Sequence, residues 1–185
     1  MPHNSDDLSV ARLVVVSLVL FAMLAAAAWS DVQTRRVANR LNGGLLIAGV
    51  MASVALHGAG AGITGALSGL GVAFVIWMPM YALRLMGGGD VKLMLASGAW
   101  LGWQGALVAS LATGVAGGVL GALWLLRSRG AFATLQALVT TVRHPWSLRS
   151  QPYDAKDRVP YAVAIAVGVC TAWVMMWYPI LRSVG

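Results

Sequence analysis

The sequence contains no glutamate, only one cysteine and few charged residues of any kind. The single cysteine, Cys170, cannot form a disulfide within the chain or supply a paired-cysteine metal site. Charged residues make up 10% of the 185 residues, whereas a soluble domain carries roughly a quarter. Without glutamate, any carboxylate chemistry must come from the six aspartates: Asp6, Asp7, Asp31, Asp90, Asp154 and Asp157.

Long apolar runs make up most of the chain. Hydrophobic residues account for 59% of it, and the mean hydropathy is +0.77. A membrane-spanning helix needs about 20 mainly apolar residues. Five runs approach or reach that length: Val10–Trp29, Leu41–Leu56, Ile63–Leu83, Gly105–Leu126 and Val159–Leu181. A sixth, Val91–Trp103, is short at about 13 residues and can span if the bilayer thins locally. We therefore predict an all-α fold, a single polytopic membrane helix bundle of about six transmembrane helices over residues 1–185.

Lysine and arginine residues lie in alternate connections between these runs. Arg35, Arg36 and Arg40 follow the first run, whereas the loop that begins at His57 has neither Lys nor Arg. By the positive-inside rule, the basic connections face the cytoplasm. The same side receives Arg84, Lys92, Arg127, Arg129, Arg143, Arg149, Lys156 and Arg158. We therefore expect both termini on the outer side. The net charge of +7 fits contact with anionic lipid, and we expect no nucleic-acid partner because no basic patch is interleaved with aromatics.

Two stretches of the chain are ambiguous by composition. Asp6 and Asp7 precede the first run, where a signal peptide needs basic residues, so we expect a retained helix. The stretch from Ala131 to Trp146 is too short and too polar to span. We expect it to form an interfacial helix on the cytoplasmic surface that stops before Pro145.

Glycines recur at a spacing that suits helix packing. Small residues four apart let two helix backbones approach closely in lipid. The pairs are Gly65 and Gly69, Gly114 and Gly118, and Gly117 and Gly121. We expect each pair to lie at a helix–helix contact.

Asp31 and Asp90 lie at the ends of apolar runs, whereas the other aspartates lie in polar segments and are expected to be solvated. The topology puts both at the cytoplasmic edge. We expect Asp90 at a helix N-cap, where unpaired N–H groups favour a carboxylate, and Asp31 at a helix C-terminus, where the dipole disfavours one. Partial desolvation raises the pKa of a carboxyl group, so we predict an unequal pair that shares one proton. In aspartic proteolysis, the ionised acid of such a pair takes a proton from water and the protonated one polarises the scissile carbonyl.

Three glycines, Gly87, Gly88 and Gly89, directly precede Asp90. Glycine adopts positive φ readily and leaves room for another backbone. An extended substrate could therefore lie beside the acids. An ordinary turn with a capping aspartate is the alternative reading of these four residues taken alone.

Taken together, two stretches resemble the motifs of the type IV prepilin peptidases, polytopic aspartic proteases of bacterial inner membranes. "DVQTRRVANRLN", which begins at Asp31, is similar to the family's first motif of an aspartate, basic residues and an isoleucine–proline–asparagine ending. "GGGDVKL" is similar to its GxGD motif with the lysine and leucine that follow. The resemblance implies that Asp31 and Asp90 are catalytic and that Gly87 and Gly89 are the fixed glycines. Lys92 falls on the family's lysine, either as a charge that tunes the pKa of Asp90 or as an interfacial anchor.

The resemblance also implies a location, a substrate and partners. The expected protein lies in the bacterial inner membrane with periplasmic termini and an active site facing the cytoplasm. It cuts prepilins or pseudopilins between a short hydrophilic leader that ends in glycine and an apolar helix, and it uses no metal or other cofactor. Besides substrate and membrane lipid, partners could include the pilus-assembly machinery or a second copy of the chain.

Some features depart from the larger members of the family. Ala38 stands where the family often has proline. The paired CxxC motifs of the larger members, which also N-methylate the new pilin terminus, do not occur, and no glycine-rich strand-to-helix turn suits S-adenosylmethionine. The chain therefore resembles the short, Flp-type pilus-assembly branch, and methyl transfer is not implied.

Other functions stay open on the sequence. A small ion- or proton-coupled transporter also carries intramembrane carboxylates, but it predicts acids near the midplane and broken helices in both halves. A structural subunit of a secretion machine would tolerate loss of either acid. The nearest enzymatic alternative is a presenilin-like GxGD protease, whose partner aspartate follows a tyrosine inside a helix, whereas Asp31 follows Ser30.

Overall fold

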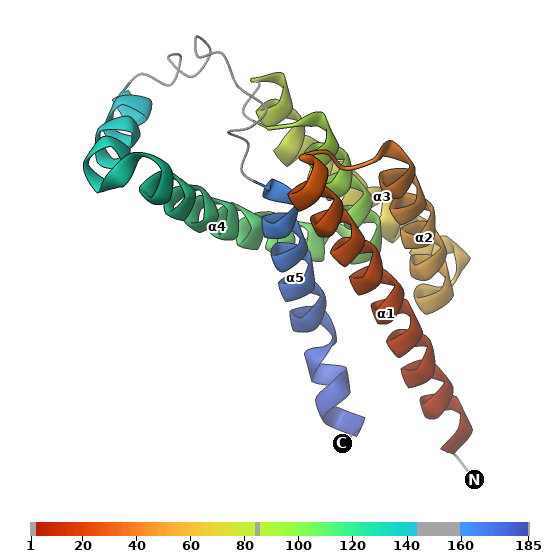
Figure 1. Ribbon diagram of the computed structural model, residues 1–185. Helices are drawn as coiled ribbons and strands as arrows, with labels where there is room; N and C mark the ends of the chain where they lie inside the picture. Colours follow the sequence, from red (N-terminus) through yellow and green to blue (C-terminus); the bar gives the residue numbers. More distant parts are fainter. Residues whose placement is uncertain (1–2, 84–85, 144–159, 185) are drawn as a thin grey trace.

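The fold is a bundle of five α-helices, seen in a computed structural model that describes residues 3–83, 86–143 and 160–184 (Figure 1). The helices are α1 (His3–Thr34), α2 (Asn39–His57), α3 (Ala59–Ala82), α4 (Gly88–Arg143) and α5 (Tyr161–Val184). These ranges contain no strand. The predicted all-α fold class is therefore confirmed.

Each of the five helices contains a segment long and apolar enough to cross a membrane. These segments are Val10–Thr34, Asn39–His57, Ala59–Ala82, Gly88–Trp124 and Tyr161–Pro179. Large apolar side chains cover the outside of the bundle; Val75 is 71% exposed and Leu111 is 74% exposed. Such a surface is stable against lipid tails, where a helix also satisfies its own backbone hydrogen bonds. The chain is a multi-pass membrane protein.

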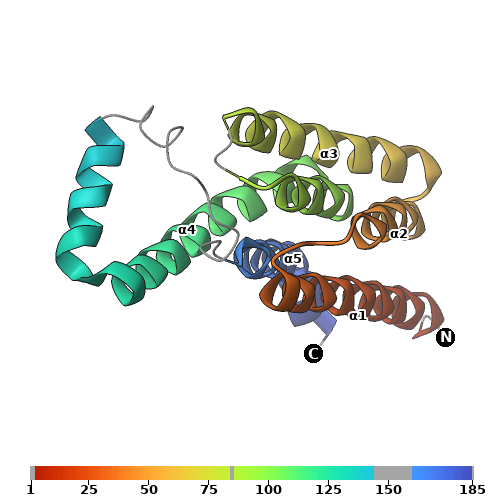
Figure 2. The same cartoon turned by 45° about the horizontal axis from the view of Figure 1, so that its top comes forward.

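The first part of α4 lies at the centre of the bundle (Figure 2). The helix contacts α2, α3 and α5, whereas α1 contacts α2 and α5. Leu93, Met94, Ser97 and Ala99 are almost completely buried. Asp90, in the first turn of the same helix, thus directly precedes a deeply buried part of the bundle.

The structure differs from the sequence-based prediction along α4. The sequence predicts helices over Val91–Trp103 and Gly105–Leu126 with a turn between them, but α4 is assigned as one helix that reaches Arg143. Gly102 has a φ of 63°, and α4 changes direction. Residues 105–117 still pack on α5, and only the last part of α4 extends away from the other helices (Figure 1). Glycine tolerates this left-handed conformation, so the chain bends without ending the helix. The structure therefore has five candidate spans, and the count of six stays a prediction.

The stretch expected to form an interfacial helix falls partly within α4. Residues 131–143 continue α4 instead of forming a separate element. Residues 144–146, together with Asp154 and Asp157, lie outside the described ranges. Their predicted roles are therefore not tested.

Glycines make the closest contacts between helices, but only some of the predicted ones do so. A Cβ on Gly69 of α3 would overlap the carbonyl oxygen of Gly98 in α4, so these two backbones touch. Gly117 of α4 lies against the ring of Tyr161. In contrast, three other glycines on α4 have open space where a Cβ would stand: Gly114, Gly118 and Gly121. The packing prediction is wrong for those three.

Helix ends gather at two opposite edges of the bundle. The end of α1 and the starts of α2, α4 and α5 meet at one edge, here named the site edge and uppermost in Figure 1. The start of α1, the turn at Gly58 and the end of α5 lie at the opposite edge. The two ends of the chain thus lie on the same side of the bundle. Which side of the membrane this is stays a prediction.

Candidate active site

Asp31 is buried in the last turn of α1, at 6% exposure. The helix ends just beyond it, because Arg35 adopts a left-handed conformation (φ 54°) and donates its N–H to the Asp31 carbonyl at 2.8 Å. The Asp31 carboxyl oxygen Oδ2 accepts a hydrogen bond of 3.1 Å from the backbone N–H of Ala162, in the first turn of α5. The carboxyl group is therefore directed from the end of one helix to the start of another.

Asp90 is half-buried in the first turn of α4. It is not the N-cap that the sequence predicts, because α4 begins at Gly88 and Gly87 precedes it. The Gly87 carbonyl accepts the N–H groups of Asp90 at 3.1 Å and Val91 at 3.2 Å, so Gly87 occupies the cap. Asp90 still lies at a helix N-terminus, where a negative charge is favoured.

The helix dipoles no longer distinguish the two acids. From the sequence, Asp31 is expected only at the C-terminus of α1, where negative charge is disfavoured. In the structure, Asp31 also meets the N-terminus of α5 through Ala162, and that terminus favours it. The predicted inequality of the pair therefore does not follow from helix termini.

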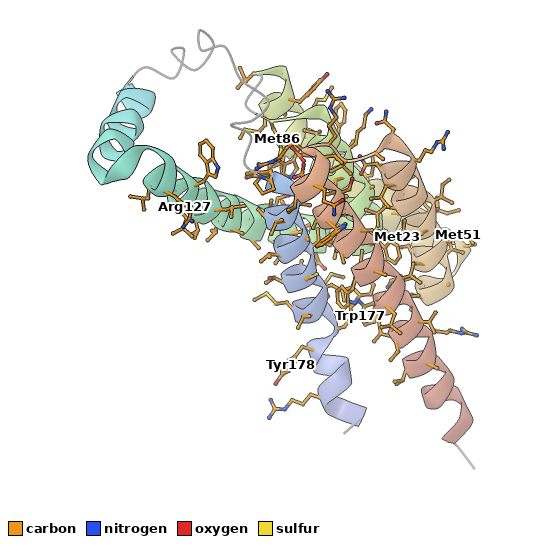
Figure 3. All side chains as sticks on the ribbon, viewed as in Figure 1. Met23, Met51, Met86, Arg127, Trp177 and Tyr178 are labelled. Atoms are coloured by element: carbon orange, nitrogen blue, oxygen red, sulfur yellow. The ribbon has the colours of Figure 1, made fainter. Side chains whose placement is uncertain are left out.

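The three glycines before Asp90 pack closely, but not through unusual backbone angles. Among the described residues, positive φ occurs only at Arg35, Gly58 and Gly102, so Gly87, Gly88 and Gly89 do not use this freedom. A Cβ on Gly87 would stand 3.1 Å from Oδ2 of Asp90, and one on Gly88 would stand 3.1 Å from the ring of Tyr81. Both are tighter than ordinary contacts. Figure 3 shows Met86, which directly precedes these glycines, at the site edge. Approach of a substrate along them stays a prediction.

The two sequence motifs lie against each other at the site edge. The side-chain amide Nδ2 of Asn42, near the start of α2, donates to the Gly89 carbonyl at 3.1 Å. The Lys92 ammonium donates to Oδ1 of Asn39 at 3.0 Å. A Cβ on Gly89 would stand 3.6 Å from the backbone of Val37, an ordinary contact. The two motif segments are thus joined directly. The pairing of Asp31 with Asp90 and the tuning of Asp90 by Lys92 stay predictions.

A third segment, the start of α5, completes the site and was missed by sequence reasoning. Ala162 binds Asp31, and the preceding residue, Tyr161, lies within electrostatic reach of the Asp90 carboxylate. One hydrogen bond thus ties the start of α5 to Asp31. Pro160, directly before the helix, marks a helix start in the sequence, but nothing in the sequence indicates that a backbone amide there meets Asp31.

The surroundings of the site are basic. Arg36 and Arg40 are exposed and Arg35 is half-buried; their predicted role as topology determinants is not tested by the fold. Among the side chains that the structure describes, no three from His, Cys, Asp and Glu gather as metal ligands would.

Comparison with known proteins identifies relatives of the part of the chain that contains both acids. A model of the type IV leader peptidase family matches residues 18–122. The prepilin leader peptidase/N-methyltransferase of Aeromonas salmonicida (strain A449) is 32% identical over 124 residues, which cover 62% of this chain and 41% of the relative. The protein of the same name in Burkholderia pseudomallei (strain K96243) is 33% identical over 120 residues, or 61% of this chain and 38% of the relative.

The matches cover only part of this chain and part of each relative. The chain matches less than half the length of these curated relatives. No solved structure matches it. Asp31 and Asp90 lie inside residues 18–122, whereas Ala162 lies outside them.

Proposed function

The chain belongs to the type IV leader peptidase family, and on that premise we propose that it is a membrane aspartic endopeptidase that removes the short leader from prepilins and pseudopilins. Asp31 and Asp90 are the proposed catalytic residues. The proposal covers only the peptidase reaction. Both of these acids lie within residues 18–122, which match the family.

The observation that carries the proposal is the contact between the two motifs. Asn42 binds the backbone of Gly89, and Lys92 binds Asn39. These bonds join residues 47 and 53 positions apart in the chain. A pair of acids needs such a connection, because general acid–base catalysis requires both groups to reach one substrate at the same time.

In the proposed reaction, one carboxylate takes a proton from a water molecule, whose oxygen attacks the scissile carbonyl carbon. The other carboxyl group gives its proton to the carbonyl oxygen. The intermediate then collapses as the C–N bond breaks: the leaving nitrogen takes the proton removed from water, and the second acid recovers its proton. The pair ends with one proton, as it began, and it titrates as a unit.

Location at a membrane edge suits this class of substrate. A prepilin has a hydrophilic leader joined to an apolar helix. If the apolar helix lies in the bilayer, the junction lies at the membrane surface, at the depth of helix ends such as those carrying Asp31 and Asp90. The Flp branch, and a site that faces the cytoplasm from the inner membrane, are parts of this proposal.

Co-expression with candidate small pilins from the same organism tests the function. The mature pilin should lose its leader, and mass measurement should place the new terminus directly after a glycine. A precursor of unchanged mass, in cells whose membranes contain the inserted protein, would contradict the proposal. The Asp90→Asn protein, in which the proposed activity should be strongly reduced, provides the matched control for cleavage by host enzymes.

Reporter fusions test the orientation. A fusion between Arg127 and Arg158 should report the cytoplasm, because this stretch is rich in Arg. A fusion after His57, where no Lys or Arg follows for many residues, should report the periplasm. The reverse pattern would place the site edge on the outer side and remove the proposed location.

A further inference from the structure

The backbone N–H of Ala162 makes a hydrogen bond that the proposed reaction has not yet used. It donates to Oδ2 of Asp31 at 3.1 Å, and both residues are buried: Asp31 is 6% exposed and Ala162 is 0% exposed. The bond joins residues 131 positions apart. It therefore reflects the fold and not local chain geometry.

This N–H is available because of its place in the helix. The first N–H groups of an α-helix have no partner within the helix, and α5 begins at Tyr161. The next amide, of Val163, already donates to the Pro160 carbonyl at 3.3 Å. The Ala162 amide points instead to the carboxyl group, and a bond from an N–H to a carboxylate is among the stronger hydrogen bonds in proteins.

The donor is held on a well-packed support. The ring of Tyr161 lies directly against Gly117, where any side chain would overlap it. The same ring meets Trp77 edge-to-face, with centroids 6.5 Å apart, and Trp77 donates to Ser110 at 2.9 Å. Packing on both α3 and α4 therefore fixes the first turn of α5. A fixed donor can in turn fix the plane of the carboxyl group that it binds.

We propose that the Ala162 N–H is a positioning group that holds the Asp31 carboxyl in the orientation needed for hydrolysis, so that the first turn of α5 is a third component of the active site. The proposal rests on the proposed peptidase function. It adds a backbone group, outside the residues that match the family, to the two aspartates within them.

Replacement of one atom tests the proposal. Lactic acid, incorporated at position 162 by nonsense suppression, exchanges the amide N–H for an ester oxygen and leaves the methyl side chain in place. Because a hydrogen bond to a charged group is among the stronger ones, kcat for a prepilin substrate should fall about 10-fold to 100-fold, which is about 1.4–2.7 kcal/mol. KM should stay within about 2-fold, because a positioning group acts on the chemical step and not on binding.

An ester at a remote position serves as the matched control. Lactic acid at Ala61, in the first turn of α3 at the opposite edge, makes the same chemical change away from the acids and should leave kcat unchanged. An ester at position 162 with wild-type kcat, or one that alters only KM, would overturn the positioning role.

Amide hydrogen exchange tests the bond without an activity measurement and without the ester protein. In Asp31→Ala protein, the Ala162 amide should exchange faster than in wild type, while the Val163 amide keeps its rate. Equal rates at Ala162 in the two proteins would overturn the proposal. If the wild-type protein cleaves no prepilin, the proposed function fails and the positioning role falls with it, even where the exchange result confirms the bond.

Discussion

The two edges of the helix bundle are held together by different kinds of contact. At the site edge, hydrogen bonds join distant segments: Asn42 to Gly89, Lys92 to Asn39 and Ala162 to Asp31. One aromatic pair, Tyr161 with Trp77, also lies beside the start of α5. Towards the opposite edge, several aromatic rings pack on one another, and two of them also donate hydrogen bonds: Trp100 to the Leu45 carbonyl at 2.9 Å and Trp173 to Ser17 at 2.8 Å. His57 lies 6.1 Å from Trp177, and Trp173 lies 5.7 Å from Trp177 and 6.3 Å from Trp100, measured between ring centroids.

The two kinds of contact contribute differently: ring packing mainly stabilises the fold, whereas hydrogen bonds also fix the direction of particular atoms. Aromatic pairs contribute packing free energy and allow several geometries, so the ring–ring contacts do not by themselves fix the direction of one atom. Hydrogen bonds are short and directional, and a buried polar group costs free energy if it is not satisfied. Their presence around Asp31 and Asp90 fits a region in which particular atoms must point in particular directions. Substitutions at the two edges should accordingly affect different quantities.

The largest effect is expected at the two acids. Asp31→Asn and Asp90→Asn should each lower the rate of prepilin cleavage by about 10²-fold to 10⁴-fold, because each removes a proton-transfer group. Quantitative mass spectrometry of the product measures the rate, and membrane fractionation checks insertion. Asp6→Asn makes the same chemical change in the polar N-terminal stretch and should cleave normally. Normal processing by either site variant would remove the mechanism.

A smaller effect is expected where the two motifs touch. Asn42→Ala removes the bond to Gly89, so the segment carrying Asp90 loses an attachment, and cleavage should slow by up to about 100-fold through misplacement. Stability should change little, because Oδ1 of Asn42 is already buried without a partner among the described residues, and its removal offsets part of the lost bond. Asn39→Ala removes an exposed contact with Lys92 and should slow cleavage less than Asn42→Ala does. A large loss of stability with full activity in Asn42→Ala would contradict this account.

Packing beneath the site should affect stability more than chemistry. Gly117→Ala forces a methyl group into the ring of Tyr161, and overpacking of this kind costs about 1–3 kcal/mol. The neighbouring substitution Gly118→Ala meets open space and should leave thermal unfolding in detergent unchanged. Similar unfolding midpoints for the two variants would show that Tyr161 is not fixed as described.

The smallest effect is expected at the opposite edge. His57→Ala removes one exposed ring from Trp177 and should destabilise the protein by less than about 1 kcal/mol. Cleavage should proceed at the wild-type rate. A marked fall in the rate, with the protein still folded, would break the distinction between the two edges.

The sequence allowed the two motifs to be recognised and their aspartates to be proposed as catalytic, because both depend on the types of side chain present. Apolar runs identified the helices, and the two aspartates at run ends identified the site edge. The third component could not be found in this way, because any residue except proline supplies a backbone N–H, and the contact spans 131 positions. The continuity of α4 was missed because glycine is compatible with both a turn and a bent helix, and only tertiary packing decides between them at Gly102.

The central claim is that Asp31 and Asp90 act as one unit, and the double variant tests it most directly. The cleavage rates of Asp31→Asn, Asp90→Asn and the doubly substituted protein should be measured under one condition. Groups that act together give strongly non-additive losses, so the double variant should be about as slow as the slower single variant. A double variant slower by the product of the two single factors would mean that the acids act independently, and it would contradict the account.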